Sequence, residues 1–225
     1  MTAVKRISYS ALIASAVASA LLVVCSVYLL TAPSSASMRL VERFERTRVF
    51  WQQWDIAEQL VALHDPAILP KLEHWLTNDD RHLRANAAYV FAMYGGKRGF
   101  DVICAILKDS SDRPEGQGSP GPMSVLIPAD PSQVRDIPNA YYLKWRIPAD
   151  RYYAAHVLGD IRSPKAVPIL VPLLSDKDVQ YIVPWALTEI GDRRAIPPLI
   201  RSLSDEDPSF RVLVIKALAQ LQANV

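Results

Sequence analysis

The 225-residue sequence contains few of the residue types that usually indicate a redox compartment. It has only two cysteines. Cys25 lies within a long apolar run near the N-terminus, and Cys104 stands alone in the remainder of the chain. No disulfide between two such positions is plausible, because a bridge requires Cα atoms less than about 7 Å apart. The cysteine content therefore does not indicate whether the protein lies in a reducing or an oxidising compartment.

The sequence also has little net charge. All 23 acidic residues and all but two of the 25 basic residues lie beyond residue 36, so this part of the chain carries no formal net charge. The two exceptions, Lys5 and Arg6, account for the basic balance of the whole chain. A neutral domain lacks the sequence-independent attraction to phosphates on which nucleic-acid binders depend. We therefore expect no nucleic-acid partner.

No residue marks a catalytic centre. A nucleophilic serine or cysteine needs a base beside it, and no pattern in the sequence singles out such a pair. Three aspartate pairs could be read as acid–base carboxylates: Asp79 with Asp80, Asp176 with Asp178, and Asp205 with Asp207. Because these pairs recur at regular intervals, the capping of helices explains them better. The sequence predicts no catalytic residues and no cofactor.

The first feature that the sequence does contain is an uncharged run over residues 7–32, which follows a short basic tail at 1–6. As a helix it would extend about 39 Å, at about 1.5 Å per residue, against a membrane core of about 30 Å. We therefore expect a transmembrane signal-anchor helix over 7–32 and count the membrane among the partners. Lys5 and Arg6 favour a cytoplasmic N-terminus. The favoured localisation is a single-pass membrane protein with an extracytoplasmic repeat domain.

Two alternatives to this anchor remain open. The first is a cleaved signal peptide, with Ser34 and Ala36 as the small residues before the cut, although such apolar regions run to about 15 residues. The second is a lipoprotein signal that ends at Cys25, which the bulky Val24 disfavours. The membrane orientation also has an alternative. Four arginines shortly after the apolar run favour the opposite orientation: Arg39, Arg43, Arg46 and Arg48.

The second feature is an internal repeat. The stretch "AVPILVPLLSDKD" at 166–178 returns as "AIPPLIRSLSDED" at 195–207. Earlier and more divergent copies occupy 54–80 and 83–109, and a last copy begins at Phe210. Each unit consists of two apolar segments of about 10 to 13 residues and recurs about every 30 residues, which suits pairs of helices rather than strands.

The stretches "VLGDIRSPKAVPILVPLLSDKD" and "ALTEIGDRRAIPPLIRSLSDED" resemble the HEAT-like repeats first grouped with phycobilisome chromophore lyases. The resemblance covers 54–108 and 150–221. It implies an all-α fold, an α-solenoid of about four and a half HEAT-like helical hairpins preceded by one transmembrane helix. Repeats 1 and 2 would occupy 54–108, and repeats 3 to 5 would occupy 150–225.

Such repeats serve mainly as binding surfaces, so the resemblance implies a non-catalytic, membrane-anchored scaffold for a protein partner of unknown identity. The alternative is an accessory or lyase-like factor that handles a chromophore or cofactor, although no catalytic signature of a lyase is present. Metal-dependent members of this repeat class, such as deoxyhypusine hydroxylase, use several His-Glu dipeptides. This sequence has none, and His64-Asp65 is a single poor imitation. We expect no metal site.

The repeat alignment also predicts a structural ladder. By the resemblance, Arg84, Arg151 and Arg211 occupy one equivalent position and would pair with the aspartates at the unit boundaries, Asp176, Asp178, Asp205 and Asp207. Prolines should shape the second segments. Pro168 and Pro197 lie about a turn inside, which predicts a late helix start or a tight first turn. Pro172 and Pro184 should kink their helices.

Residues 109–149 interrupt the repeats with a Pro/Gly-rich insertion. Seven of the 17 prolines fall between residues 109 and 150. A segment of this length without repeats is typically functional or disordered. Its aromatic residues either fold back onto the repeats or contact a partner, where such side chains dominate binding energy. The candidate partner-binding residues here are Tyr141, Tyr142 and Trp145.

The two ends of the repeat region raise similar alternatives. The last segment has few polar breaks, so either Arg211, Lys216 and Gln220 form a narrow solvent-facing stripe or the end stacks on another element. Phe210 and Ile215 are the corresponding candidate partner residues.

At the other end, residues 38–65 predict one long helix whose juxtamembrane part, 37–63, leads into the first repeat. Its apolar face would contain Leu40, Phe44, Trp51, Trp54 and Val61. It serves as a cap and stalk, or lies on the membrane surface.

Overall fold

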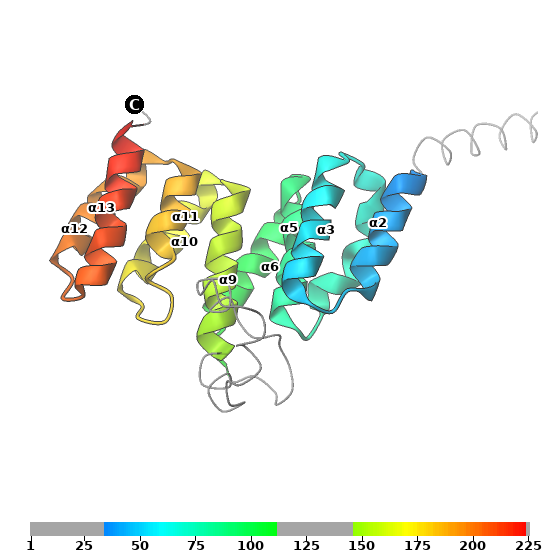
Figure 1. Ribbon diagram of the computed structural model, residues 1–225, viewed down its shortest axis with the longest axis horizontal. Helices are drawn as coiled ribbons and strands as arrows, with labels where there is room; N and C mark the ends of the chain where they lie inside the picture. The colour runs from blue at the N-terminus through cyan, green and yellow to red at the C-terminus, as the bar shows by residue number, and fades with distance from the viewer. Residues whose placement is uncertain (1–33, 112–145, 224–225) are drawn as a thin grey trace, which may run out of the picture.

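The computed structural model describes residues 34–111 and 146–223, and within them every regular element is an α-helix or a short 3-10 helix. The prediction of an all-α fold is confirmed. The helices stand side by side along one long axis, and each element packs mainly on its neighbours in the stack (Figure 1). This arrangement is that of an α-solenoid.

The first helix of each repeat contributes to one row. This row consists of α3 (Phe50–Ala62), α5 (Arg81–Met93), α9 (Arg146–Ile161), α11 (Val183–Ile190) and α13 (Pro208–Ala223). Each member packs on the next one along the row. In Figure 1 the helices α3, α9 and α13 of this row face the viewer, and α5 is set back between α3 and α9.

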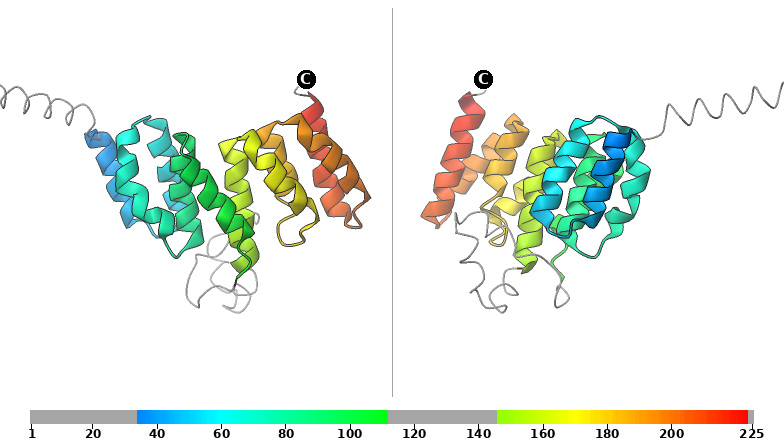
Figure 2. Two further views of the ribbon diagram at one scale, coloured as in Figure 1. Left: turned by 180° about the vertical axis from the view of Figure 1, so that it is seen from behind. Right: turned by 45° about the vertical axis from the view of Figure 1, so that its right-hand side comes forward.

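The second segments of the repeats form the opposite row, seen from behind in Figure 2. Only α6 (Lys97–Lys108) is a continuous α-helix there. The others are short α-helical pieces flanked by 3-10 turns: α4 (Leu69–Leu72) between η1 (Pro66–Ile68) and η2 (Glu73–Thr77), α10 (Val167–Leu170) between η4 (Pro164–Ala166) and η5 (Val171–Ser175), and α12 (Ile196–Arg201) between η6 (Arg193–Ala195) and η7 (Ser202–Ser204).

Proline explains these broken second segments. Pro168 and Pro197 lie in the first turns of α10 and α12, where the missing N–H costs little, and a tight 3-10 turn precedes each helix. The expectation for these two prolines is confirmed. At Pro172 the α-helix gives way to 3-10 geometry. The kink predicted at Pro184 is wrong, because α11 begins at Val183 and Pro184 lies in its first turn.

The single long helix predicted over 38–65 is also wrong. The structure has α2 (Ser35–Arg46) and then α3, with extended backbone at Thr47 and Val49 between them. β-Branched residues favour such extended conformations. The buried side chain of Gln53 donates hydrogen bonds to the carbonyl oxygens of Phe44 (3.1 Å) and Thr47 (3.3 Å), which holds the connection in place. As a result α2 folds back beside α3 and covers the N-terminal end of the stack.

This break changes which side chains are buried. The extended residues reset the helical phase, so Phe50 is buried whereas Trp51 is 40% exposed. Of the five residues predicted to share one apolar face, Phe44 is buried and three more pack against the core, namely Leu40, Trp54 and Val61, but they do so from two helices, and Trp51 is exposed. Phe44 is fully buried and packs edge-on against Trp75 of the first repeat, with ring centroids 5.4 Å apart.

The predicted single-pass membrane localisation requires correction. A membrane-spanning helix needs about 20 apolar residues. Within 34–111 and 146–223 the longest helices, α9 and α13, have 16 residues each, and no helix there is long and apolar enough to cross a membrane. The structure thus does not support the anchor or the membrane as a partner. The segment 7–32, to which the anchor was assigned, lies outside the described residues.

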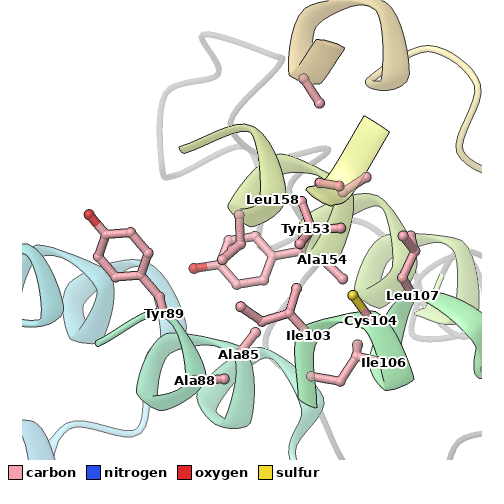
Figure 3. Close-up of a cluster of buried hydrophobic side chains, with 14 of the residues drawn as sticks. Ala85, Ala88, Tyr89, Ile103, Cys104, Ile106, Leu107, Tyr153, Ala154 and Leu158 are labelled. Atoms are coloured by element: carbon pink, nitrogen blue, oxygen red, sulfur yellow. The ribbon is translucent and has the colours of Figure 1, made fainter. Parts of the chain in front are cut away.

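The core is continuous from repeat to repeat. Figure 3 shows the junction of α5, α6 and α9, where small residues of α5 face aliphatic side chains of α6 and α9. Gly99 permits this close approach, because a Cβ atom there would lie 2.3 Å from the carbonyl oxygen of Ala88. Cys104 lies in this core, and burial raises the pKa of its thiol to about 11.

Candidate partner-binding surface

A ladder of charged contacts links successive repeats at one end of the first-helix row. The guanidinium of Arg151 in α9 donates to Asp176 and to the carbonyl oxygen of Leu107, 2.8 Å away, and lies 3.5 Å from Asp178. Arg151 is only 7% exposed. It therefore joins the end of the second repeat to the boundary that follows the third.

Equivalent contacts at the other boundaries use different residues. Arg81 pairs with Asp109, and Lys177 lies 3.2 Å from Asp205. The Tyr181 hydroxyl donates to Asp207. In each case a side chain near the start of one first helix reaches the boundary about 25 to 28 residues later.

Arg84 and Arg211, which were predicted to belong to the ladder, do not make these ion pairs within the described residues. Within the described residues Arg84 has no ion pair, and its buried Nε has no hydrogen-bond partner. Burial, followed by the charge of Arg81, lowers the pKa of Arg84. Arg211 donates to the backbone carbonyls of Asp205 (2.7 Å) and Glu206 (3.0 Å) rather than to a carboxylate. Of the three arginines predicted to form the ladder, only Arg151 pairs with a boundary carboxylate among the described residues.

The boundary aspartates also cap backbone N–H groups. Asp80 accepts from His82 and Leu83 at the start of α5, and Asp207 accepts from Ser209 at the start of α13. Asp176 and Asp205 each accept from the residue two positions later. These carboxylates are committed to structural hydrogen bonds, which matches their recurrence at every boundary.

A buried polar chain crosses the first-helix row. The Tyr153 hydroxyl in α9 donates to the side-chain oxygen of Asn86 in α5, at 2.5 Å. The Asn86 amide in turn donates to Gln53 of α3 (3.1 Å) and to the Phe50 carbonyl (2.8 Å). This polar chain was not predicted from the sequence. The only signal was an asparagine within the apolar stretch "RANAAYVFAM".

A second buried cluster surrounds His82. Its Nδ1 lies 3.0 Å from Asp150 and 3.7 Å from Asp80, and its ring stacks on Phe50. Burial alone would lower the pKa of His82, but the two nearby carboxylates, Asp150 more than Asp80, raise it to about 9. This pKa favours the protonated ring at neutral pH, in which form His82 ties α5 to α9. The cluster is a structural tie rather than an open site, because His82 is only 3% exposed.

The candidate partner residues at the chain end divide into core and surface. Phe210 is fully buried and packs edge-on near Tyr181, so it belongs to the core. Ile215 is 56% exposed. Other exposed apolar side chains occur in α12, η7 and α13, namely Ile200, Leu203 and Val212. The aromatic candidates Tyr141, Tyr142 and Trp145 lie outside the described residues.

Aromatic rings gather where α3, α5 and α9 meet on the first-helix row. Trp54 of α3 lies against Tyr89 of α5, with ring centroids 4.4 Å apart, and 6.1 Å from Tyr153 of α9. Phe50 also reaches Tyr153 at 5.1 Å. Helices α3 and α9 thus contact each other across α5 through these rings. Trp54 is half-buried, so one part of its ring remains exposed.

Carboxylates from α3 and α9 lie beside these rings. The pKa of Glu58 is raised by burial and by the negative charges of Asp160 and Asp55. The pKa of Tyr89 is raised by burial and then by the charges of Glu58 and Asp160. The charges of Glu58 and Asp160 thus act on the same tyrosine from two different helices. We define the α3–α5–α9 surface by the five residues Trp54, Asp55, Glu58, Tyr89 and Asp160.

The surface continues onto α11. His156 lies 2.9 Å from Asp160 and stacks on Trp185 with ring centroids 4.3 Å apart. A Cβ atom at Gly159 would lie 2.8 Å from the Trp185 ring, so glycine lets this tryptophan pack against α9. The i,i+4 spacings of Trp54 with Glu58 and of His156 with Asp160 were available in the sequence. The sequence did not indicate that these two pairs, from different repeats, belong to one surface.

The arrangement can bind a positively charged group but offers no evident nucleophile. Among residues 34–111 and 146–223, no group of three or more histidine, cysteine, aspartate and glutamate side chains could hold a metal ion. Cys104 is buried away from this surface, in the core of Figure 3.

Comparison with known families agrees with this architecture. Residues 150–176 match the family described as the PBS lyase HEAT-like repeat, and residues 175–225 match the family described as HEAT repeats. No curated protein matches the chain. The first matched segment spans α9 to η5, and the second spans α11 to α13, in agreement with the helical hairpins described above. The last third of the chain therefore contains HEAT repeats, and within it the segment 150–176 is similar to the PBS lyase HEAT-like repeat.

Proposed function

We propose that this protein is a non-catalytic scaffold that binds a protein partner through the α3–α5–α9 surface. Repeat solenoids bury their core between neighbouring units and leave long faces exposed, and binding proteins use such faces. The carboxylates at the repeat boundaries are engaged in caps and ladders, which leaves no unassigned acid–base pair there. The proposal therefore places function on a surface rather than in a reaction centre.

One observation carries this proposal. The α3–α5–α9 surface combines a partly exposed tryptophan with carboxylates that have no basic partner among the described residues, namely Asp55 and Glu58. Aromatic anchors and complementary charges are the features that dominate protein–protein binding. The ladder and cap contacts lie at the repeat boundaries, whereas this surface draws on the middle of α3, the second half of α5 and the C-terminal end of α9.

Site-specific cross-linking tests the proposal. A benzophenone amino acid is placed at Ala62, which is exposed on α3 one helical turn beyond Glu58 and on the same face, and in a matched chain at Lys71, which is exposed on the second-helix row. Irradiation in the cells that produce the protein should yield a discrete adduct from position 62 and not from position 71. Adducts of equal intensity at both positions, or none at position 62, would refute the assignment to this surface.

The alternative function is a lyase-like accessory role in handling a chromophore. Its support is the match of 150–176 to the PBS lyase HEAT-like repeat. Incubation of the purified protein with bilins, followed by absorbance spectroscopy after denaturing gel filtration, distinguishes the two. The scaffold proposal expects no covalently coloured chain and no transfer of bilin to an acceptor protein.

A further inference from the structure

One face of α13 carries exposed apolar side chains at the spacing of a helical stripe. Val212 is 50% exposed, and Ile215 is 56% exposed, more than any other large apolar side chain of the described residues. Ala219 is also exposed and lies one turn further along the same side of the helix. We call the surface formed by Val212, Ile215 and Ala219 the α13 face. Single exposed apolar residues are common, whereas a continuous apolar stripe is typical of an interaction site.

Helix α5 occupies the equivalent place in the second repeat and shows what covers such a face. Asp80 precedes α5 and Asp207 precedes α13, and each accepts a hydrogen bond from the backbone N–H two residues later. When the helices are aligned on these caps, Ala85 and Ala88 of α5 correspond to the valine and isoleucine of the α13 face. Both alanines are fully buried where α5 meets α6 and α9 (Figure 3). The α13 face thus corresponds to a face that helices cover in the second repeat, and no described element covers it in α13.

Helix α6 indicates the kind of element that fits such a face. It approaches α5 so closely that a Cβ atom at Gly99 would lie 2.3 Å from the Ala88 oxygen. It turns Ile103, Ile106 and Leu107 toward the core, while its charged side chains are exposed. An amphipathic helix of about three turns is therefore the element that covers a first helix in the second repeat.

The charge of α13 decides between a helix of another protein and a second copy of this chain. Helix α13 contains Arg211 and Lys216 and no acidic residue. Lys216 is exposed, and neither side chain forms an ion pair within the described residues. Two copies of α13 packed on each other would bring like charges together, whereas a helix with acidic side chains would pair with these cations. The charge of α13 therefore favours an acidic partner helix.

We propose that the α13 face binds an amphipathic helix of a partner protein, with acidic side chains beside its apolar stripe. The apolar residues of that helix cover Val212, Ile215 and Ala219, and its acidic side chains reach Lys216. A helix whose apolar face lies on an apolar surface is a recurring mode of recognition. The α13 face shares no residue with the α3–α5–α9 surface, so this inference goes beyond the proposed function and adds a second binding surface.

Designed peptides test this inference without knowledge of the partner. They have about 18 residues, long enough to form a helix in water, and carry a fluorescein label. The first has a leucine stripe flanked by glutamates, the second has the same stripe flanked by lysines, and the third is a scrambled form of the first without a stripe. Each is titrated against the full chain by fluorescence anisotropy.

We expect the acidic striped peptide to bind at least about tenfold more tightly than each of the other two, because only it matches both the stripe and the charge. Equal binding of the acidic and basic peptides would overturn the inference, and so would the absence of binding by the acidic peptide at about 0.1 mM.

Matched variants assign the binding to the α13 face. Val212→Ser/Ile215→Ser removes the stripe, and Leu63→Ser/Met93→Ser removes two apolar side chains that are exposed elsewhere. The first pair should weaken binding of the acidic peptide at least about tenfold and the second less than about twofold. Equal losses in the two pairs would overturn the assignment. Circular dichroism verifies that each variant is folded.

Reversal of one charge tests the acidic character of the partner helix. Lys216→Glu should weaken binding of the acidic peptide and strengthen binding of the basic one, because the exposed side chain changes sign. Unchanged affinities for both peptides would contradict an acidic partner.

Sedimentation of the full chain tests the competing occupant. A dimer that Val212→Ser/Ile215→Ser dissociates would show that a second copy covers the α13 face, and would overturn the inference. The cross-linking at Ala62 concerns a different surface. A missing adduct there refutes the proposed function and leaves the peptide results standing, and negative peptide results leave that adduct standing.

Discussion

Gly99 illustrates how a single residue sets the spacing of two helices. A Cβ atom at this position would lie 2.3 Å from the Ala88 oxygen and 2.5 Å from the Ala92 nitrogen. Both are backbone atoms of α5, so a side-chain rotation cannot relieve the clash and α6 must move away. Overpacking of this kind costs about 1–3 kcal/mol, more than the roughly 1 kcal/mol that alanine gains over glycine in a helix.

We therefore expect Gly99→Ala to lower the free energy of unfolding, measured by urea denaturation, by at least about 1 kcal/mol. The control is Lys97→Ala, two residues away, which removes only an exposed ion pair with Asp101 and should change stability by less than about 0.5 kcal/mol. A Gly99→Ala protein as stable as the parent would show that the two helices can separate freely.

His82 carries a prediction about pH. Its pKa is about 9 in the folded protein against 6.5 for an unperturbed histidine. The folded state thus holds this proton more tightly than the unfolded state. Its contribution to stability is complete below about pH 6.5 and is lost as the pH rises toward 9, by up to about 3 kcal/mol.

We expect the free energy of unfolding to fall between pH 6.5 and 8.5 in the parent chain. His82→Gln, which cannot be protonated, should be less stable at pH 6.5 and should show a flatter profile across the same range. Urea titrations at four pH values measure both profiles. Parallel profiles for the two proteins would contradict a protonated His82.

At the scale of elements, the polar chain through Asn86 fixes how three first helices meet. Tyr153→Phe removes the donor to the Asn86 oxygen and leaves a buried carbonyl without a partner, at a cost of about 1–3 kcal/mol. The control is Tyr152→Phe, the adjacent and less buried tyrosine, which makes no hydrogen bond within the described residues. We expect it to change the unfolding free energy by less than about 0.5 kcal/mol. Similar losses in both variants would argue against a specific role for the chain.

The helical hairpins were predictable at this scale, because their signals are local. The boundary aspartates, the tight first turns at Pro168 and Pro197, and the 29-residue repeat all depend on neighbouring residues. The break between α2 and α3 was not predictable from periodicity, because Thr47 to Val49 interrupt a pattern that otherwise continues. Gln53 stabilises that break from six or more residues away.

At the scale of the whole molecule, a solenoid differs in stability along its length. Helix α5 packs on α3, α6 and α9, whereas α13 at the end of the described stack packs on α11 and the last second segment. Interior repeats have two neighbours and terminal ones have one. Hydrogen exchange should therefore be slowest in α5 and faster in α12 and α13, where Ile200 and Ile215 are more than half exposed. Uniform protection across the repeats, measured by mass spectrometry, would contradict this gradient.

The sequence by itself determined the kind of fold, because a repeated apolar pattern with capped boundaries has few ways to bury its surface other than stacking. It also determined that the boundary aspartates are structural. Only the tertiary structure decided which residues meet from different repeats. Arg151 rather than Arg84 pairs with a boundary carboxylate, and Phe210 is buried while Ile215 is exposed. Trp54, Glu58, Tyr89 and Asp160 converge from three helices into one surface. Such contacts depend on the angles between repeats, which arise from the sum of many packing interactions and leave no local pattern in the chain.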